Sequence, residues 1–303
     1  MKLPVVDDSI KNKRVLIRGD LDTPVDDYSR LEAIWPTVEF LLKNGNTVIL
    51  SGHIGRPEGK FSEQFSTKRI AEWFAKKELM SSWIDGGLRG FEIDKNFVVL
   101  ENLRFFAEEE NNDEGFTKEL AGLGEIYVNE SFANCERAHA SMVGVPKLLP
   151  HFAGFRLAKE IEVLSGVLEN PGRPLLVIIG GTKVETKQPL IDKMEGFADV
   201  VVIGGKLATE EKDFLIESLP GAKTIVWNGP MGDIENGYEA GTRKLVDLIL
   251  AQKEAFKIVG GGDTVGYINK LGMADKFDWV STGGGSMLKF LCGEVLPGLE
   301  ALL

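Results

Sequence analysis

The sequence repeats one pattern along its length: a short, continuous apolar run ends abruptly at Gly, Asn or a charged residue, and a helical stretch follows. The runs, with the residues that end them, occupy 14–20, 47–57, 97–105, 126–132, 175–183, 200–206, 224–232, 256–263 and 279–285. Continuous apolar strands that alternate with helices are typical of parallel sheets covered on both faces. Ligands of such sheets bind at the carboxyl ends of the strands, which is where the glycines and polar residues stand here.

The stretches between the runs predict helices and a division into two domains. Residues 29–45 and 112–124 have helical apolar spacing and end at a glycine. Residues 155–174 are amphipathic and stop at Asn-Pro-Gly. We therefore expect a long helix that joins two α/β domains, residues 1–154 and 175–303. The last residues could pack back on the first domain.

The composition limits the classes of function. With 303 residues, of which 43% are hydrophobic and 27% charged, the chain is long enough for two domains. Its net charge of −11 argues against a main role in nucleic-acid binding, because such proteins need a basic face. The two cysteines, Cys135 and Cys292, predict no disulfide scaffold and fit a reducing cytoplasm. We expect no signal peptide, no membrane span and, with three histidines and no Cys/His cluster, no zinc site.

The polar residues at the strand ends differ between the early and the late runs. The first four runs and the residues just after them supply Arg18, Asp20, His53, Arg56, Arg104, Arg137 and His139. The later five supply mainly glycines, with Lys183, Lys187, Asn228 and Asp263. Guanidinium groups suit a small, highly charged anion, whereas glycine-rich strand ends let backbone N–H groups approach nucleotide phosphates. This arrangement is typical of a kinase of small phosphorylated molecules, in which an Asp could hold magnesium.

Each of these signals is weak alone. Residues 180–187, GGTKVETK, place two lysines on one helix face after a strand, but their spacing differs from that of a Walker A loop. The glycine loops 260–263 and 281–285 could be plain turns, and neither matches the dinucleotide fingerprint. His53 could be structural. The acidic run 108–110 is expected to lie on the surface.

Taken in order, the motifs resemble those of the phosphoglycerate kinase family. The stretch KRVLIRGDLDTPV resembles the family's RVLVRVDFNVP signature. Its counterparts continue in the family's order with SRLEAIWPTVEFLLKNG, GHIGRPEGK, VVLENLRF, RAHASMVGV, AGFRLAKEIEVL, GGTKVETK, TIVWNGPMG, VGGGDT and STGGGSMLKFLCGEVLPGLEAL. The resemblance implies two doubly wound α/β domains joined by a long helix. It also implies that they bind phosphoglycerate and Mg-ADP or Mg-ATP, and close about a hinge.

The resemblance further implies which residues form the site. Those of the substrate pocket would be Asp20, Asp22, Arg30, His53, Ile54, Gly55, Arg56, Arg104 and Arg137. Arg30, Lys183 and Lys187 would act on the phosphoryl group in transfer. Those that bind nucleotide would be Gly181, Lys183, Lys187, Gly204, Gly205, Asn228, Glu235, Gly261, Gly262, Asp263, Thr264, Gly283, Gly284 and Gly285. Asp263 would hold magnesium. The expected partners are small-molecule substrates, with neither nucleic acid nor membrane, and a cytoplasmic monomer is expected.

Three departures from the family pattern bear on affinity. Asp22 replaces a neutral Asn, so weaker binding of 3-phosphoglycerate is expected unless an arginine neutralises the carboxylate. Glu136 stands where the family often has His, and it could hold Arg137 in an ion pair. After 201–208 a large piece of the nucleotide domain is missing, because only 209–223 precede the next strand. Looser nucleotide binding and a relaxed base preference are therefore expected.

Two other interpretations stay open on the sequence. The chain could be a catalytically silent homologue that binds nucleotide or a partner, although the retained Arg30, Lys187 and Asp263 argue against this. It could also be a kinase of a related small carboxylate, because Asp22 and Glu136 alter the substrate pocket. Nucleotide binding without turnover would identify the first, and activity with a different carboxylate the second.

Overall fold

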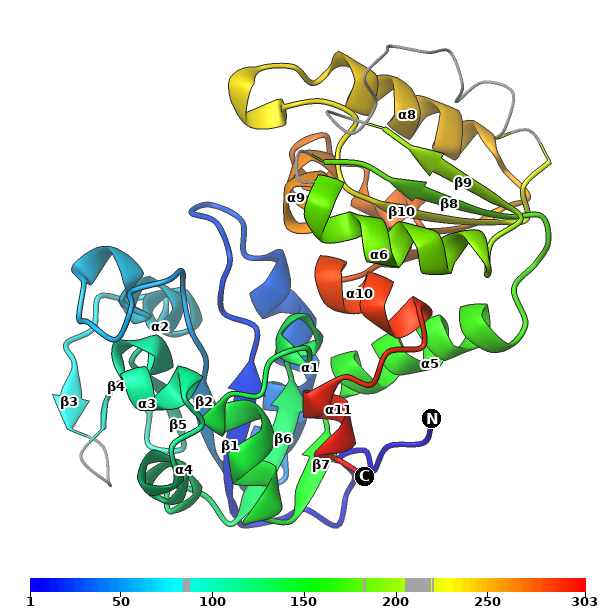
Figure 1. Ribbon diagram of the computed structural model, residues 1–303. Coiled ribbons are helices and arrows are strands. Elements are labelled where there is room, and N and C mark those ends of the chain that lie inside the picture. Colours follow the sequence, from blue (N-terminus) through cyan, green and yellow to red (C-terminus); the bar gives the residue numbers. More distant parts are fainter. Residues whose placement is uncertain (84–87, 182–183, 205–218, 220) are drawn as a thin grey trace. The chain divides into compact units, whose positions relative to one another are not determined.

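Each apolar run of the sequence contains a strand in the computed structural model, and the strands gather into two sheets. The structure describes residues 1–83, 88–181, 184–204, 219 and 221–303. The chain divides into unit 1, which comprises Met1–Glu160 and Leu296–Leu303, and unit 2, which comprises Ile161–Val295. Each unit has its own sheet, so the predicted α/β class with two parallel-sheet domains is confirmed (Figure 1).

The sheet of unit 1 has seven strands in the order β3-β4-β5-β2-β1-β6-β7. Their bounds are β1 Arg14–Gly19, β2 Thr47–Ser51, β3 Ser82–Trp83, β4 Arg89–Asp94, β5 Phe97–Leu100, β6 Ile126–Glu130 and β7 His151–Ala153. The five strands β5, β2, β1, β6 and β7 pair with one another in parallel. Strand β4 pairs antiparallel with both β3 and β5. Strands β3 and β4 lie outside the apolar runs that predicted the parallel strands.

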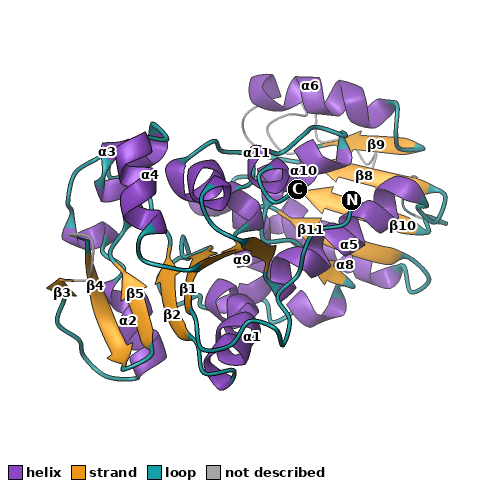
Figure 2. Ribbon diagram, turned by 90° about the horizontal axis from the view of Figure 1, so that it is seen from below, coloured by secondary structure: helices purple, strands orange, loops and turns teal. Residues whose placement is uncertain are grey.

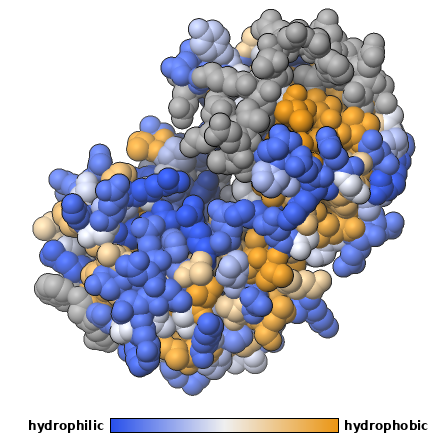
Figure 3. Space-filling view, viewed as in Figure 1, coloured by the Kyte–Doolittle hydropathy of each residue, from blue (hydrophilic) through white to orange (hydrophobic). Residues whose placement is uncertain are grey.

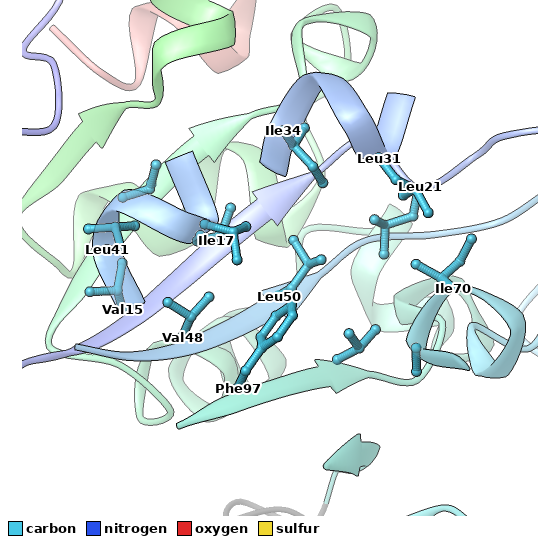
Figure 4. Close-up of a cluster of buried hydrophobic side chains, with 14 of the residues drawn as sticks. Val15, Ile17, Leu21, Leu31, Ile34, Leu41, Val48, Leu50, Ile70 and Phe97 are labelled. Atoms are coloured by element: carbon cyan, nitrogen blue, oxygen red, sulfur yellow. The ribbon is translucent and has the colours of Figure 1, made fainter. Parts of the chain in front are cut away.

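Helices cover both faces of this sheet, with α1 on one face and α3 and α4 on the other (Figure 2). The helices of unit 1 are α1 Ser29–Lys43, α2 Lys68–Ala75, α3 Ala107–Glu110, α4 Glu114–Ala121 and α11 Pro297–Glu300. Val15 and Ile17 of β1 face the core under α1 and α2 (Figure 4). Because side chains alternate along a strand, Arg18, at the next position, faces the other side, where it contacts Ser141. The core residues on the α1 side include Leu21, Leu31, Ile34, Leu41, Val48, Leu50, Ile70 and Phe97.

The sheet of unit 2 has five strands, all parallel, in the order β12-β11-β10-β8-β9. Their bounds are β8 Leu175–Ile179, β9 Val200–Ile203, β10 Thr224–Asn228, β11 Phe256–Gly260 and β12 Trp279–Val280. The helices are α6 Val184–Glu195, α8 Ala240–Ala251, α9 Gly262–Lys270 and α10 Gly284–Leu291. Helices α6 and α8 lie on opposite faces of this sheet (Figure 1), and Leu245, Val246 and Ile249 of α8 pack on its core residues.

Helix α5, Phe155–Glu169, contains the boundary between the units. Its first turn is held by unit 1, because Glu130 accepts hydrogen bonds from the Arg156 and Leu157 backbone N–H groups at 3.2 and 2.9 Å. Such a carboxylate satisfies donors that have no partner within the helix. The helix ends at Glu169 rather than extending to 174, as expected where Asn-Pro-Gly follows.

The visible face of unit 1 is mostly hydrophilic (Figure 3). This agrees with a chain that carries a net charge of −11. In the part of the chain that the structure describes, no helix combines the length and apolar character needed to span a bilayer.

Candidate active site

In unit 1 the strand order reverses beside β1. From β1 the chain builds the sheet outward through β2 and β5 on one side and through β6 and β7 on the other. Ligands of open α/β sheets bind where the order reverses in this way, at the carboxyl ends of the two central strands. Here those are β1 and β6, which are followed by Asp20 and by the segment that carries Arg137 and His139.

Arg18 lies fully buried near the end of β1, on the sheet face that carries α3, since it contacts Ser141, which in turn bonds to Glu109 of α3. Its Nε donates to Ser141 Oγ at 2.9 Å, its Nη2 donates to His53 Nδ1 at 2.9 Å, and its Nη1 donates to the Gly19 carbonyl. Each of these three acceptors is a neutral group.

His53 follows β2 and is 3% exposed. Because a guanidinium can only donate, His53 Nδ1 must accept from Arg18, and the ring proton of the neutral imidazole resides on Nε2. Burial and the nearby charges of Arg18, Arg104 and Arg137 lower the pKa of His53 well below its usual value. His53 is therefore a neutral hydrogen-bond donor at physiological pH, and its contacts are those of a site residue and not of a residue that only fills the core.

Arg104 follows β5 in the short 3₁₀ turn Leu103–Phe105, where Asn102 accepts its backbone N–H at 2.9 Å. Its Nη1 donates to the Gly55 carbonyl at 2.9 Å, and its Nε lies 3.3 Å from Glu110 Oε1. Its Nη2 is buried and has no hydrogen-bond partner among the described residues. An unpaired buried guanidinium nitrogen is costly, which indicates that a ligand supplies the missing acceptor.

Arg137 and His139 complete this group, which we call the arginine–histidine cluster: Arg18, His53, Arg104, Arg137 and His139. Burial and the three arginines lower the pKa of His139 to about 3, so this imidazole is also neutral. Arg137 Nη2 lies 3.8 Å from Glu136 Oε1, so the expected local ion pair is present, though at long range. Burial, and after it the charges of neighbouring arginines, lowers the pKa of His53, Arg104 and His139, as expected where basic groups crowd together without an anion between them.

Asp20 and Arg30 form an ion pair at the edge of the cluster. Arg30 Nη1 lies 2.9 Å from both carboxylate oxygens of Asp20, which is almost completely buried. The Asp20 carboxylate raises the pKa of Arg30. Arg30 stands in the first turn of α1, so the pair fixes a charged side chain at the carboxyl end of β1.

Asp22 binds a backbone group rather than an arginine. Its Oδ1 accepts the Gly55 N–H at 2.8 Å, and its Oδ2 lies 3.9 Å from His53 Nε2. Gly55 has φ +62°, and a Cβ there would come within 2.4 Å of the Phe65 ring, so the loop requires glycine. Ile54 is buried, whereas Arg56 is exposed and stands apart from the buried contacts of the cluster.

The acidic run 108–110 is not all surface, and the expectation for it is wrong at its middle residue. Glu109 is 1% exposed and accepts from Ser141 through both its oxygens. The contact joins residues 32 positions apart, so the local charge pattern could not reveal it.

In unit 2 the strand order reverses between β8 and β10. The Gly180 and Gly181 N–H groups, which follow β8, donate to the carbonyls of Asn228 and Pro230 at 2.8 and 2.9 Å. A Cβ at Gly180 would lie 2.3 Å from the Pro230 carbonyl oxygen. The two strand ends therefore approach each other backbone to backbone, which only glycine permits.

The loops that follow β10, β11 and β12 also approach one another closely through their backbones. Asn228 Nδ2 donates to the Gly284 carbonyl at 2.9 Å. A Cβ at Gly284 would lie 2.5 Å from Gly261 Cα, and Gly261 itself has φ +102°. Helices α9 and α10 start at these loops, with Gly261 and Gly283 as their N-terminal flanking residues. Helix N-termini and closely packed glycine backbone form a cradle that suits phosphate.

The remaining predicted nucleotide residues fall around this cradle or outside the described residues. Thr264 is fully buried, and its Oγ1 has no hydrogen-bond partner among the described residues. Four other predicted nucleotide residues lie in the first turns of α9 and α10 or just after β9: Gly262, Asp263, Gly285 and Gly204. Lys183 and Gly205 lie outside the described residues, as do the side chains of Lys187 on α6 and Glu235.

A resident metal site is not evident, since no group of three His, Cys, Asp or Glu side chains comes together in the described ranges. Asp263 is exposed in the first turn of α9, beside the glycine cradle. Magnesium is usually bound by one or two carboxylates together with substrate phosphates. The residues therefore fit an ion that arrives with a nucleotide.

The sequence placed Arg18 and His139 at strand ends, but the site residues implied by the family resemblance do not include them. Ser141 and Glu109 are also absent from those implied site residues. The signal for Arg18 was the alternation along β1, which puts it on the face opposite Val15 and Ile17. Ser141 and Glu109 carry no such signal, because their role depends on tertiary contacts.

The comparisons with known proteins agree with this geometry. A sequence model described as phosphoglycerate kinase matches residues 5–212 and 209–294. The phosphoglycerate kinases of Coprothermobacter proteolyticus and Leptospira biflexa are 34% and 33% identical, over all of this chain and 99% of each relative. The solved structure of phosphoglycerate kinase from Coxiella burnetii matches with a TM-score of 0.80 and 27% identity, over 99% of both chains. That from Pyrococcus horikoshii OT3 matches with a TM-score of 0.81 and 25% identity, over 97% of this chain and 96% of the other.

The comparisons also agree with the gap that the sequence predicted. The first alignment spans 394 positions, whereas this chain has 303 residues, so roughly 90 positions have no counterpart here. The two matches to the family meet at residues 209–212, just after β9 and outside the described residues.

Proposed function

The chain belongs to the phosphoglycerate kinase family, and from that premise we propose how its residues carry out the transfer of a phosphoryl group between 1,3-bisphosphoglycerate and ADP, which gives 3-phosphoglycerate and ATP. As a member of this family it is a phosphotransferase. The family match does not favour a silent homologue.

Phosphoglycerate would bind to unit 1, against the arginine–histidine cluster. The observation that carries this assignment is the buried Nη2 of Arg104, which has no hydrogen-bond partner in the described part of the chain and lies amid other basic groups. A carboxylate or phosphate oxygen would supply the acceptor and offset the mutual repulsion of the cluster. The substrate would be oriented by the loop His53–Arg56 together with Asp20, Asp22, Arg30 and Arg137.

Nucleotide would bind to unit 2, at the glycine cradle formed by the ends of β8, β10, β11 and β12. Its phosphates would lie against the N-termini of α9 and α10, and Asn228 would keep the loops at Gly261 and Gly284 together. Glu235 would bind the ribose.

Asp263 would hold magnesium that arrives with ADP or ATP, since its carboxylate is exposed beside the cradle. The ion would neutralise charge on the nucleotide phosphates during transfer. The protein's own contribution would be to orient the nucleotide through Gly262, Thr264 and the glycines that open α10.

Catalysis would rest on positioning and on cations around the phosphoryl group, because its transfer needs little covalent help from the protein. Arg30 would supply charge from unit 1, and Lys183 and Lys187 from unit 2. We propose that the two units close about a hinge, so that these cations meet at the phosphoryl group only in the closed state and water is excluded. A monomer in the cytoplasm is part of the proposal.

The test is a coupled assay with 3-phosphoglycerate, ATP and magnesium, in which glyceraldehyde-phosphate dehydrogenase reports loss of NADH. Turnover is expected in the unaltered protein and should disappear in Lys187→Ala. Lys193→Ala is the matched control, because Lys193 lies on the same helix and pairs with Glu294 at 2.7 Å instead of facing the cradle. Folded protein that binds Mg-ATP but shows no turnover would overturn the proposal.

A further inference from the structure

Glu109 is the carboxylate that lies behind the arginine–histidine cluster. It is 1% exposed on α3, and neither the family motifs nor the proposed mechanism assigns it a role. Burying an ionised carboxylate is costly unless it is paired or hydrogen-bonded. Its neighbours Glu108 and Glu110 on the same short helix are exposed, so the burial of Glu109 is specific.

A hydrogen-bond relay leads from Glu109 to the substrate pocket. Glu109 accepts the Ser141 N–H at 2.9 Å and the Ser141 hydroxyl at 2.5 Å. Because that hydroxyl donates its one proton to Glu109, its lone pair faces Arg18, whose Nε donates to it at 2.9 Å. Arg18 in turn donates to His53 Nδ1 at 2.9 Å. The carboxylate therefore sets the direction of the Ser141 hydroxyl, and the guanidinium, which can only donate, sets the direction of the bond to His53.

The last step of the relay acts on the site. With Nδ1 engaged by Arg18, the neutral His53 presents its Nε2–H, which lies 3.9 Å from Asp22 Oδ2. Contact with Arg18 therefore decides which nitrogen of His53 donates, and the hydrogen bond to Ser141 decides how the Arg18 guanidinium is turned.

Burial raises the pKa of Glu109, and the nearby charges of Arg18 and Arg104 oppose that rise, so Glu109 also faces these arginines as a source of negative charge. The two roles predict opposite effects of neutralising it. If it only offsets the arginines, removing its charge should strengthen anion binding. If it orients the relay, removing it should weaken binding.

We propose that Glu109 is a positioning residue for phosphoglycerate: through Ser141 it holds the Arg18 guanidinium in the orientation in which its Nη2 donates to His53 Nδ1. The inference rests on the proposed function, in that it assigns Glu109 a role at the same substrate pocket.

The kinetic test compares Glu109→Gln and Ser141→Ala with Glu108→Gln, which makes the same charge change at an exposed residue of the same helix. The first two variants should raise the KM for 3-phosphoglycerate about tenfold, the size of one hydrogen bond with a charged partner. The KM for ATP should stay unchanged. The double variant should be no worse than the more severe single one, because both changes break one relay. A KM for 3-phosphoglycerate that falls or stays the same in Glu109→Gln, or that rises equally in Glu108→Gln, would overturn the inference.

A second measurement needs no turnover. The chain has three histidines, so ¹⁵N NMR of the imidazole nitrogens can resolve His53. The unaltered protein should show the Nε2–H tautomer, and Ser141→Ala should shift the Nδ1 resonance as the Arg18 contact loosens. An unchanged spectrum in both Ser141→Ala and Glu109→Gln would refute the relay. If the unaltered protein lacked kinase activity, the proposed function would fail, and this spectrum would still decide the role of Glu109.

Discussion

Gly284→Ala should damage the nucleotide cradle while leaving the fold of unit 1 unaffected. An ideal Cβ at this position lies 2.5 Å from Gly261 Cα and 2.8 Å from Gly261 N, both of which are backbone atoms. An ordinary contact starts near 3.4 Å, so the two loops must separate by about 1 Å. The shift would also break the 2.9 Å hydrogen bond from Asn228 to the Gly284 carbonyl. Overpacking of this kind costs about 1–3 kcal/mol of stability, which unit 2 bears.

The effect on function should exceed the effect on stability. Since a misplacement of about 1 Å in a phosphate site is enough to lose a hundredfold in rate, we expect the KM for ATP to rise at least about tenfold. The KM for 3-phosphoglycerate should not change.

Gly266→Ala supplies the matched control for the same chemical change. Gly266 lies within α9 of the same unit, and an added Cβ meets nothing within 4 Å. Alanine there should stabilise the helix by about 0.5–1 kcal/mol and leave both KM values alone. The reasoning fails if Gly284→Ala retains the KM for ATP and the melting temperature of the unaltered protein.

Three further predictions follow from the substrate and nucleotide sites. Asp22→Asn should lower the KM for 3-phosphoglycerate, because the Asp22 carboxylate is paired with a backbone N–H and not with an arginine; an unchanged KM would count against repulsion. The folded state lowers the pKa of His139 to about 3 from its usual 6.5, so between these values the unfolded chain binds a proton that the folded chain does not. Stability against urea should therefore fall as the pH is lowered from about 6.5, and His139→Gln should flatten that slope. Finally, with roughly 90 alignment positions missing, ATP should bind loosely and GTP should be accepted; a submillimolar KM for ATP with strong rejection of GTP would contradict this.

The strands that the sequence predicted are those whose apolar character is continuous. Parallel strands covered on both faces must be apolar on both, as β8 is with five buried residues in a row. Strand β4 lacks this signal, because only Gly90 and Phe91 of its six residues are buried. Strand β7 has three residues and is too short to form a pattern. Both strands lie outside the central row formed by β5, β2, β1 and β6. Outside that row, one face of a strand can be exposed to solvent.

For the candidate site too, the sequence predicts the residues that follow strands but not those brought together by the packing of helices. Asp20, His53 and Arg104 follow strands, so the topology alone brings them to one edge of the sheet. Glu109 and Ser141 lie on short helical segments whose mutual approach depends on how α3 and the π-helical turn Ala140–Gly144 pack. A sequence pattern reports the period of one element. It does not report which carboxylate in a run of three turns inward.

The strand order of unit 2 leaves room for the proposed nucleotide site even in a chain with so long a gap relative to its relatives. The phosphate cradle uses the ends of β8, β10, β11 and β12, which are consecutive neighbours in the sheet. The break in the family match follows β9, which stands at the end of the described sheet and pairs with β8 there. A deletion beyond an edge strand removes none of the ladders between the cradle strands, whereas a deletion after β10 or β11 would separate the loops that Asn228 ties together. The contacts most exposed to such a loss are those on the β9 side of the nucleotide, and this is why the base preference, rather than phosphate binding, is expected to relax.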